Sequence, residues 1–166
     1  MRQSSTLRVA KPAEADHLSD LAARSKAYWG YSAAFVDACR SELSVSSDDI
    51  QNPACHYVVA ERAGKIIGFY GIERLSPHEF ELDALFVEPQ LVGCGIGRAL
   101  IARAKTHIAR AGGGTLLIQS DPNAEGFYRA MGAERIGHKA SASFPGRRLP
   151  LLAIAIPAIT DKRDRA

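Results

Sequence analysis

The sequence is short of several features that mark whole classes of proteins. It has three cysteines, and no two of them form a Cys-x-x-Cys pair, which argues against a disulfide framework or a thiolate metal site. No stretch approaches the roughly 20 apolar residues of a membrane span, and the amino terminus lacks the apolar run of a secretory signal. We therefore expect reduced thiols, no bound metal, no membrane contact and a cytoplasmic protein.

An excess of charge of one sign is also missing. The 21 basic and 18 acidic residues give a formal charge of +3 and are mixed along the chain, which argues against a nucleic-acid partner but leaves small anionic ligands open. The 166 residues, 46% of them hydrophobic, suit one globular domain. We expect this domain to span 1–159 and the charged tail 160–166 to fray.

The order of the expected elements is βααβββαβαββ, typical of a mixed α/β domain. Hydrophobic periodicity and turn residues predict strands at 6–10, 56–61, 66–75, 80–88, 115–120, 133–139 and 149–156. The same signals predict helices at 12–29, 32–43, 46–50, 96–111 and 123–131. In the first helix, Ala15, Leu18, Leu21 and Ala22 recur at helical spacing. The apolar stretch 149–156 would suit an edge strand used in a homodimer.

Three glycines, Gly93, Gly95 and Gly97, lie between a strand and a helix. Glycine there leaves backbone amides open, and a helix start offers about four unpartnered N–H groups and a partial positive charge. The natural ligand is an anion, usually phosphate; the alternative is a plain tight turn. A P-loop is excluded because Arg98 and Ala99 follow the last glycine, and the spacing does not fit Gly-x-Gly-x-x-Gly.

The stretches "VEPQLVGCGIGRALIARA" and "SDPNAEGFYRAMGAERIG" together resemble the GNAT superfamily of acetyl-coenzyme A dependent N-acyltransferases, whose signature is R/Q-x-x-G-x-G/A. The resemblance implies an α+β fold: a mixed, mostly antiparallel sheet of six to seven strands with about four helices. Gln90, Gly93 and Gly95 fit this signature literally. The family's second glycine directly precedes the helix, however, so we prefer to place the pair at Gly95 and Gly97. Val92 then stands where Arg or Gln is usual.

The resemblance also implies a site for acetyl-CoA. Main-chain groups of Leu85, Phe86 and Val87 would hold the pantetheine arm, with one amide polarising the thioester carbonyl. The residues expected at the pyrophosphate are Val92, Gly93, Cys94, Gly95, Ile96, Gly97 and Arg98. The later motif adds Tyr128 and an Asn, which the family often has near Asp121 and for which Asn123 is the substitute here.

The chemistry requires a base, because an alkyl amine with pKa near 10 is charged at neutral pH. Period-2 alternation predicts that Glu81, Asp83, Leu85 and Val87 share one face of their strand. The resemblance favours Glu81 as the base, with Glu73 in reserve. The alternative is that these are solvated carboxylates on an exposed face.

The departing thiolate needs a proton, and the resemblance assigns this role to Tyr128. The alternative is that Tyr128 anchors its short helix on the sheet, although Phe127 is the expected core residue. Cys94 has no neighbouring His or Asp in sequence, so a covalent acetyl carrier is not expected.

The resemblance implies that the loop with Trp29 and Tyr31 shapes the acceptor site, and we also expect Asp83 and Arg147 there. The alternatives are that the aromatic residues form a local packing cluster and that Arg147 faces solvent. The predicted function is transfer of an acetyl group from acetyl-CoA to a small-molecule primary amine by direct attack in a ternary complex. Two alternatives stay open: an acyl-CoA binding module without turnover, and an acetyltransferase of protein lysines or N-termini.

Overall fold

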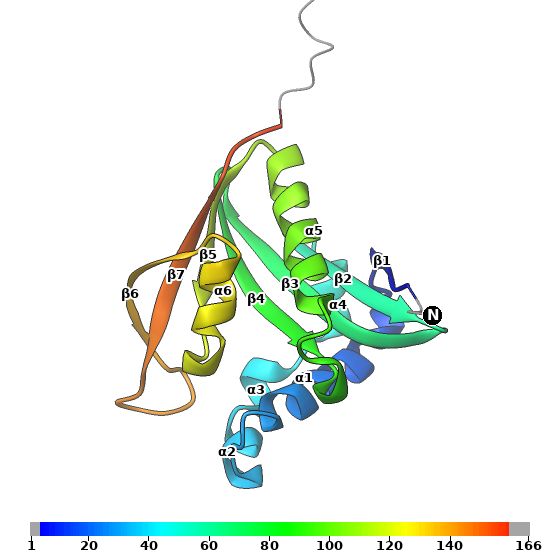
Figure 1. Cartoon of the computed structure of the whole chain (residues 1–166), viewed down its shortest axis with the longest axis vertical. Helices are drawn as coiled ribbons and strands as arrows, with labels where there is room; N and C mark the ends of the chain where they lie inside the picture. Colours follow the sequence, from blue (N-terminus) through cyan, green and yellow to red (C-terminus); the bar gives the residue numbers. More distant parts are fainter. Residues whose placement is uncertain (1–3, 160–166) are drawn as a thin grey trace, which may run out of the picture.

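The computed structural model describes residues 4–159 (Figure 1). Its strands are β1 Thr6–Val9, β2 Cys55–Arg62, β3 Lys65–Ser76, β4 Glu79–Val87, β5 Gly114–Gln119, β6 Glu134–Ala140 and β7 Arg148–Ile156. Its α-helices are α1 Ala15–Ala27, α2 Ala33–Ala38, α3 Arg40–Leu43, α4 Ser47–Gln51, α5 Ile96–Arg110 and α6 Glu125–Ala130. Short 3₁₀ turns begin at Pro12, Pro89 and Pro122. The tail 160–166, which we expect to fray, lies outside the described residues.

The strands form one seven-stranded sheet in the order β1-β2-β3-β4-β5-β7-β6. Every neighbouring pair is antiparallel except β4 and β5, which are parallel. The predicted α+β fold with a mixed, mostly antiparallel sheet is therefore confirmed. The expectation that 149–156 forms an edge strand is wrong: β7 lies between β5 and β6, and its apolar side chains Leu152, Ile154 and Ile156 are buried.

Helices cover both faces of the sheet and create two apolar clusters. On one face, Leu100, Ile101 and Ile108 of α5 pack against the sheet. On the other face, Leu18 and Leu21 of α1 join residues of α2, α3 and the sheet. The helical spacing of apolar residues in α1 therefore identified a buried stripe correctly. Within residues 4–159, no helix is long and apolar enough to cross a membrane.

The stretch 32–43, predicted as one helix, is divided into α2 and α3 at Cys39. The backbone of Cys39 has φ −87° and ψ −3°, which departs from the α-helical values near −63° and −42°. Its side chain is buried among the apolar residues that α1 also contacts. The capping signal at 46–50 is confirmed, since Ser46 and Asp49 form a capping box at the start of α4.

Strand β4 carries a bulge that changes which side chains share a face. Ile72 pairs with Leu82 and Gly71 with Ala84, so Asp83 has no partner on β3. Before the bulge, Phe80 and Leu82 pack on the α5 face and Glu81, between them, points to the opposite face. After the bulge, Leu85 and Val87 pack on the α5 face. The predicted common face of Glu81, Asp83, Leu85 and Val87 is therefore wrong, because the extra residue reverses the alternation.

Strands β4 and β5 pair over only three positions, from Glu79 with Thr115 to Glu81 with Leu117. Beyond Glu81 the two strands diverge (Figure 1). Of the remaining six residues of β4, 82–87, all but Asp83 pair with β3, and none has a partner on the β5 side. This separation opens a cleft in the middle of the sheet.

Candidate active site

A cleft of about 810 Å³ lies between the diverging ends of β4 and β5. Most of the residues predicted for the site line it: Trp29, Glu73, Glu81, Asp83, Leu85, Phe86, Val87, Val92, Gly93, Gly95, Gly97, Arg98 and Tyr128. Five others do not contribute to its walls: Tyr31, Cys94, Ile96, Asn123 and Arg147. The fold thus brings together segments from α1, the central strands, the glycine loop and α6.

The glycine loop presents open amides to the cleft. Gly93 and Gly95 have φ of +83° and +87°, in the left-handed region that side chains other than glycine rarely adopt. Among residues 4–159, the amides of 93, 95, 96, 97 and 98 have no hydrogen-bond acceptor. Such an array of N–H groups at a helix start is a site for an anion.

Gly97 lies in the first turn of α5 and Gly95 directly precedes the helix. The expectation that the later glycine of the pair stands just before the helix is therefore wrong, although both glycines line the cleft. A Cβ on Gly97 would lie 3.3 Å from the Phe127 ring. Gly97 thus permits a close approach between α5 and α6.

The side chains of two loop residues, Ile96 and Cys94, do not line the cleft. Ile96 is 3% exposed and its side chain packs in the core beside Leu100. Cys94 is an exposed free thiol whose amide donates to the carbonyl of Leu91 at 3.2 Å. Neither side chain contributes to the lining of the cleft.

Carboxylates gather on the wall of the cleft that faces α1 and α4. Glu73 and Glu81 are cross-strand partners, Asp83 occupies the bulge, and Asp49 reaches the same wall from α4. Burial within these walls raises the pKa of Asp83 to about 7, and the negative charges of Glu73, Glu81 and Asp49 add to the effect. Asp83 is still open to water within the cleft. Lys139 lies 3.7 Å from Glu81.

Tyr128 is 7% exposed and lines the cleft from α6. Its hydroxyl has no hydrogen-bond partner within the described part of the chain. Burial, followed by the charge of Asp121, raises the pKa of Tyr128. The expectation that Phe127 would be the more buried of the pair is wrong: Phe127 is only partly buried and contacts the core from its edge.

A polar network around Asp121 contains three of the predicted residues that do not line the cleft: Tyr31, Asn123 and Arg147. The Asp121 carboxylate accepts hydrogen bonds from Lys26 Nζ at 2.6 Å, the Tyr31 hydroxyl at 2.9 Å and Asn123 Nδ2 at 2.9 Å. Arg147 Nη2 donates to the Tyr31 hydroxyl at 3.0 Å. Burial would raise the pKa of Asp121, but the hydrogen bonds from Lys26 and the Asn123 amide outweigh it and lower the pKa.

This network ties the segment after α1 to the opposite wall of the cleft. Asp121 and Lys26 themselves line the cleft, so Tyr31, Asn123 and Arg147 stand one contact behind it. The Tyr31 ring stacks on Phe35 with centroids 4.3 Å apart, and Phe35 stacks on Phe144 at 4.5 Å. The stack joins α2 to the loop between β6 and β7.

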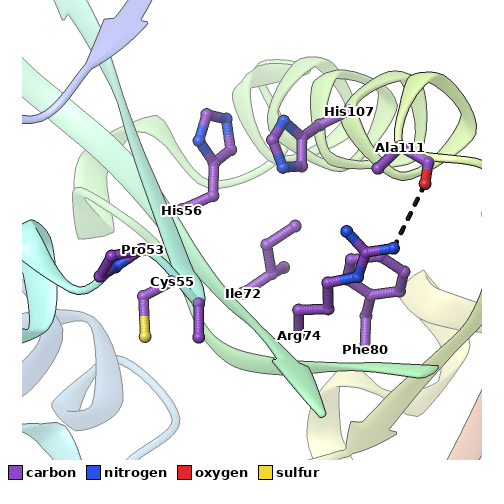
Figure 2. A pocket seen from close by; sticks show the side chains of 9 residues that line it. Pro53, Cys55, His56, Ile72, Arg74, Phe80, His107 and Ala111 are labelled. Carbon is purple, nitrogen blue, oxygen red and sulfur yellow. Dashed lines mark hydrogen bonds between the residues drawn. The ribbon is translucent and has the colours of Figure 1, made fainter. Parts of the chain in front are cut away.

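A second cavity of about 300 Å³ lies on the α5 face of the sheet (Figure 2). His56 and His107 stack there with ring centroids 3.7 Å apart. Burial, with smaller contributions from His107 and Arg103, lowers the pKa of His56 to about 4. Arg74 donates to the carbonyls of Pro77 at 2.8 Å and Ala111 at 3.4 Å. Within residues 4–159, no group of three His, Cys, Asp or Glu side chains could hold a metal ion.

The fold and the cleft define an α+β protein with a glycine loop of open amides at the junction of a central strand and a helix. Residues 15–143 match the family model described as Acetyltransferase (GNAT) domain. Because this match spans well over half of the chain, the protein belongs to the GNAT acetyltransferase family. The resemblance that its glycine loop and later motif indicate is thereby confirmed.

Two curated relatives match part of the chain. The N-alpha-acetyltransferase RimI of Mycobacterium tuberculosis (strain ATCC 25618 / H37Rv) is 37% identical over 93 residues, 54% of this chain and 58% of RimI. The peptidyl-lysine N-acetyltransferase YjaB of Escherichia coli (strain K12) is 32% identical over 74 residues, 45% of this chain and 48% of YjaB. The matches thus span about half the length of these relatives.

Solved structures match nearly the whole chain at low identity. The PaiA N-acetyltransferase of Thermoplasma acidophilum, in complex with coenzyme A, gives a TM-score of 0.73 at 18% identity, covering 92% of this chain and 99% of that one. An aminoglycoside 6'-N-acetyltransferase complexed with coenzyme A gives 0.68 at 19% identity, covering 94% and 99%. At these identities the likeness establishes the fold.

Proposed function

We propose that the protein transfers an acetyl group from acetyl-CoA to a primary amine by direct attack in a ternary complex. One observation carries the proposal: Gly93, Gly95, Gly97 and Arg98, whose amides are open, line the same cleft as the carboxylates and Tyr128. The amides and the α5 N-terminus would hold the coenzyme pyrophosphate, and Arg98 adds a positive charge in the first turn. Family membership supports acetyl-CoA as the donor.

The unpaired edge of β4 would hold the pantetheine arm. Leu85, Phe86 and Val87 line the cleft and have no strand partner on the β5 side. Amide groups of the arm can pair with this edge as a neighbouring strand would. A backbone N–H there would polarise the thioester carbonyl and stabilise the oxyanion that forms during attack.

For the general base we propose Asp83 in preference to Glu81, which the sequence favoured. A base works best when its pKa lies near the operating pH, and the pKa of Asp83 is raised to about 7. Asp83 and Leu85, two residues apart on β4, both line the cleft. Glu81 lies 3.7 Å from Lys139, so its carboxylate already has a cationic partner. Glu73 sits one strand further from the thioester.

For the general acid we propose Tyr128. Burial raises its pKa, so the phenol is protonated at neutral pH, as an acid must be. Its hydroxyl lacks a partner within residues 4–159 and borders the cleft, so it is available to the departing sulfur. Proton transfer to a thiolate, whose acid has a pKa of about 8.5, is uphill and would accompany cleavage of the C–S bond.

The acceptor is proposed to be a cationic amine, because it would enter the carboxylate-lined part of the cleft. The similarity to RimI favours a second candidate, acetylation of protein N-termini. Acetyl-CoA dependent thiol release, measured with small amines and with N-terminal peptides in parallel, separates the two. Binding of acetyl-CoA without release to any amine would instead indicate a coenzyme-binding module.

The role of Asp83 is tested by the pH dependence of turnover. Asp83→Asn should reduce kcat by about 10²-fold near neutral pH and recover toward pH 10, where the amine loses its proton unaided. Glu79→Gln is the matched control, since Glu79 lies on the same strand but is exposed outside the cleft. A loss of activity that is equal at every pH would contradict the role of base.

A further inference from the structure

Tyr57 is a buried tyrosine whose hydroxyl faces the cleft without a partner. It lies on β2, is 6% exposed and lines the cleft. No residue between 4 and 159 accepts a hydrogen bond from its hydroxyl or donates one to it. The ring is buried, whereas the hydroxyl oxygen is not among the fully buried atoms that lack a partner, so it is open to the cleft and available to a ligand there. Neither the coenzyme loop nor the proposed acid and base involve it.

The neighbouring strand is shaped to let the Tyr57 ring reach across it. Tyr57 pairs with Gly71 of β3, and Gly71 pairs with Ala84 of β4. A Cβ on Gly71 would lie 2.4 Å from the ring, closer than any real contact. The ring therefore lies directly over Gly71, on the same face as Glu73 and Glu81. Glycine at this position brings the hydroxyl to the carboxylate wall.

More carboxylates lie near Tyr57 than acetyl transfer requires as a general base. Asp49, Glu73 and Asp83 come from three different elements and line the same cleft. Glu73 stands directly opposite Glu81, an arrangement of like charges that destabilises a sheet. The reaction requires one base, which leaves Glu73 without a role in it. Asp49 uses Oδ2 to accept the Ser46 amide in the capping box at 2.8 Å, and among the described residues its Oδ1 has no donor. Two cationic side chains line the described cleft, and one of them, Lys26, is paired with Asp121.

We propose that Tyr57, Asp49 and Glu73 form a subsite for a second cationic group of the acceptor, so that the preferred substrate is a small diamine rather than a monoamine. The inference rests on the proposed function, because it names the acceptor class for that reaction. Neighbouring strands are about 4.8 Å apart, so the subsite on β2 and β3 and the reacting centre on β4 lie within the span of a short alkyl diamine. The Tyr57 hydroxyl would orient the second ammonium group between the two carboxylates.

The test compares putrescine with butylamine, which have the same chain length and differ by one amino group. In the wild type, kcat/KM should be about tenfold or more higher for putrescine, as expected for a hydrogen-bonded charge. Tyr57→Phe should raise KM for putrescine by about tenfold and leave KM for butylamine and kcat for both nearly unchanged. Asp49→Asn should act in the same direction.

Tyr70→Phe provides the matched control. Tyr70 is on the adjacent strand β3, is fully buried, and its hydroxyl also lacks a partner among the described residues. Tyr70 faces α5 on the other side of the sheet. Tyr70→Phe therefore removes a tyrosine hydroxyl, as Tyr57→Phe does, but outside the cleft. Both values of KM should match the wild type.

The outcomes separate this proposal from the proposed function. Equal kcat/KM for the two amines, or an equal effect of Tyr57→Phe on both, would overturn the subsite while acetyl transfer stands. Turnover of peptides with no turnover of putrescine would overturn it as well. Absence of thiol release with every amine would remove the proposed function. In that case calorimetry of putrescine with the coenzyme A complex decides: binding weakened by Tyr57→Phe supports the subsite, and absence of binding overturns it.

Discussion

The stacked histidines of the second cavity predict a loss of stability in mild acid. The pKa of His56 falls from 6.5 to about 4 on folding because burial, His107 and Arg103 disfavour its charged form. Between these two pH values the unfolded chain binds more protons than the folded one. The contribution to the free energy of unfolding is therefore complete above pH 6.5 and declines as the pH falls toward 4.

The magnitude follows from the size of the pKa difference. Each pKa unit corresponds to about 1.4 kcal/mol, so the change from 6.5 to about 4 sets an upper limit of about 3 kcal/mol. His56 is only partly buried, and solvent screening reduces this value. Burial also lowers the pKa of His107, which adds in the same direction. We expect the histidine pair to contribute a loss of about 1–2 kcal/mol between neutral pH and about pH 5. Asp83, whose pKa is raised to about 7, acts in the opposite direction, so the histidine contribution is read from the difference between the wild type and a His56 variant.

Urea unfolding of the wild type and of His56→Gln at the two pH values measures this loss. The change to the lower pH should destabilise the variant less than the wild type. His17→Gln, which removes an exposed histidine from α1, controls for the substitution itself. The imidazole of His56 can also be titrated directly by NMR. A folded-state pKa at or above 6.5, or a His56→Gln protein with the pH dependence of the wild type, would refute the reasoning.

Three further predictions concern the cleft. Gly95→Val should weaken binding of acetyl-CoA by about tenfold or more, because φ of +87° is strained for a β-branched residue; unchanged affinity by calorimetry would remove the loop from the site. Tyr128→Phe should lower kcat by about 10²-fold with little effect on coenzyme affinity, and wild-type turnover would exclude the acid role. Asp121→Asn should lower the free energy of unfolding by about 1–3 kcal/mol because Lys26 loses its charged partner, and an unchanged urea midpoint would show that the network contributes nothing to stability.

The features that the sequence predicted correctly are those encoded by neighbouring residues. The loop at 93–97 was recognisable because glycine spacing, the strand before it and the helix after it are all local. Apolar spacing in α1 identified its buried stripe for the same reason. The bulge at Asp83 could not be predicted, since it exists only in the pairing of β4 with β3. The reversal of Leu85 and Val87 follows from that single unpaired residue.

The network around Asp121 was equally hidden, because its members are far apart in the sequence. Lys26 and Tyr31 lie 95 and 90 residues from Asp121, and Arg147 lies 116 residues from Tyr31. The position of β7 also depends on the order of strands, which its apolar composition does not determine. A signal for Tyr57 was present in the sequence: a tyrosine within an apolar strand, followed by a second strand with glycine at its centre. Its meaning requires the register that sets the ring over Gly71.

Because β4 and β5 pair over only three positions, both strands have edges without a hydrogen-bonded neighbour. Exposed strand edges invite pairing with other chains. The outer edges of this sheet are β1 and β6, and β6 carries the charged residues Glu134, Arg135 and Lys139. The divergence after Glu81 places two more edges inside the molecule, where another chain has poor access. A coenzyme seated between them would act as the missing strand. Ligand binding would then increase the cohesion of the whole sheet, and the ligand-free protein would be the form most open to hydrogen exchange along 82–87.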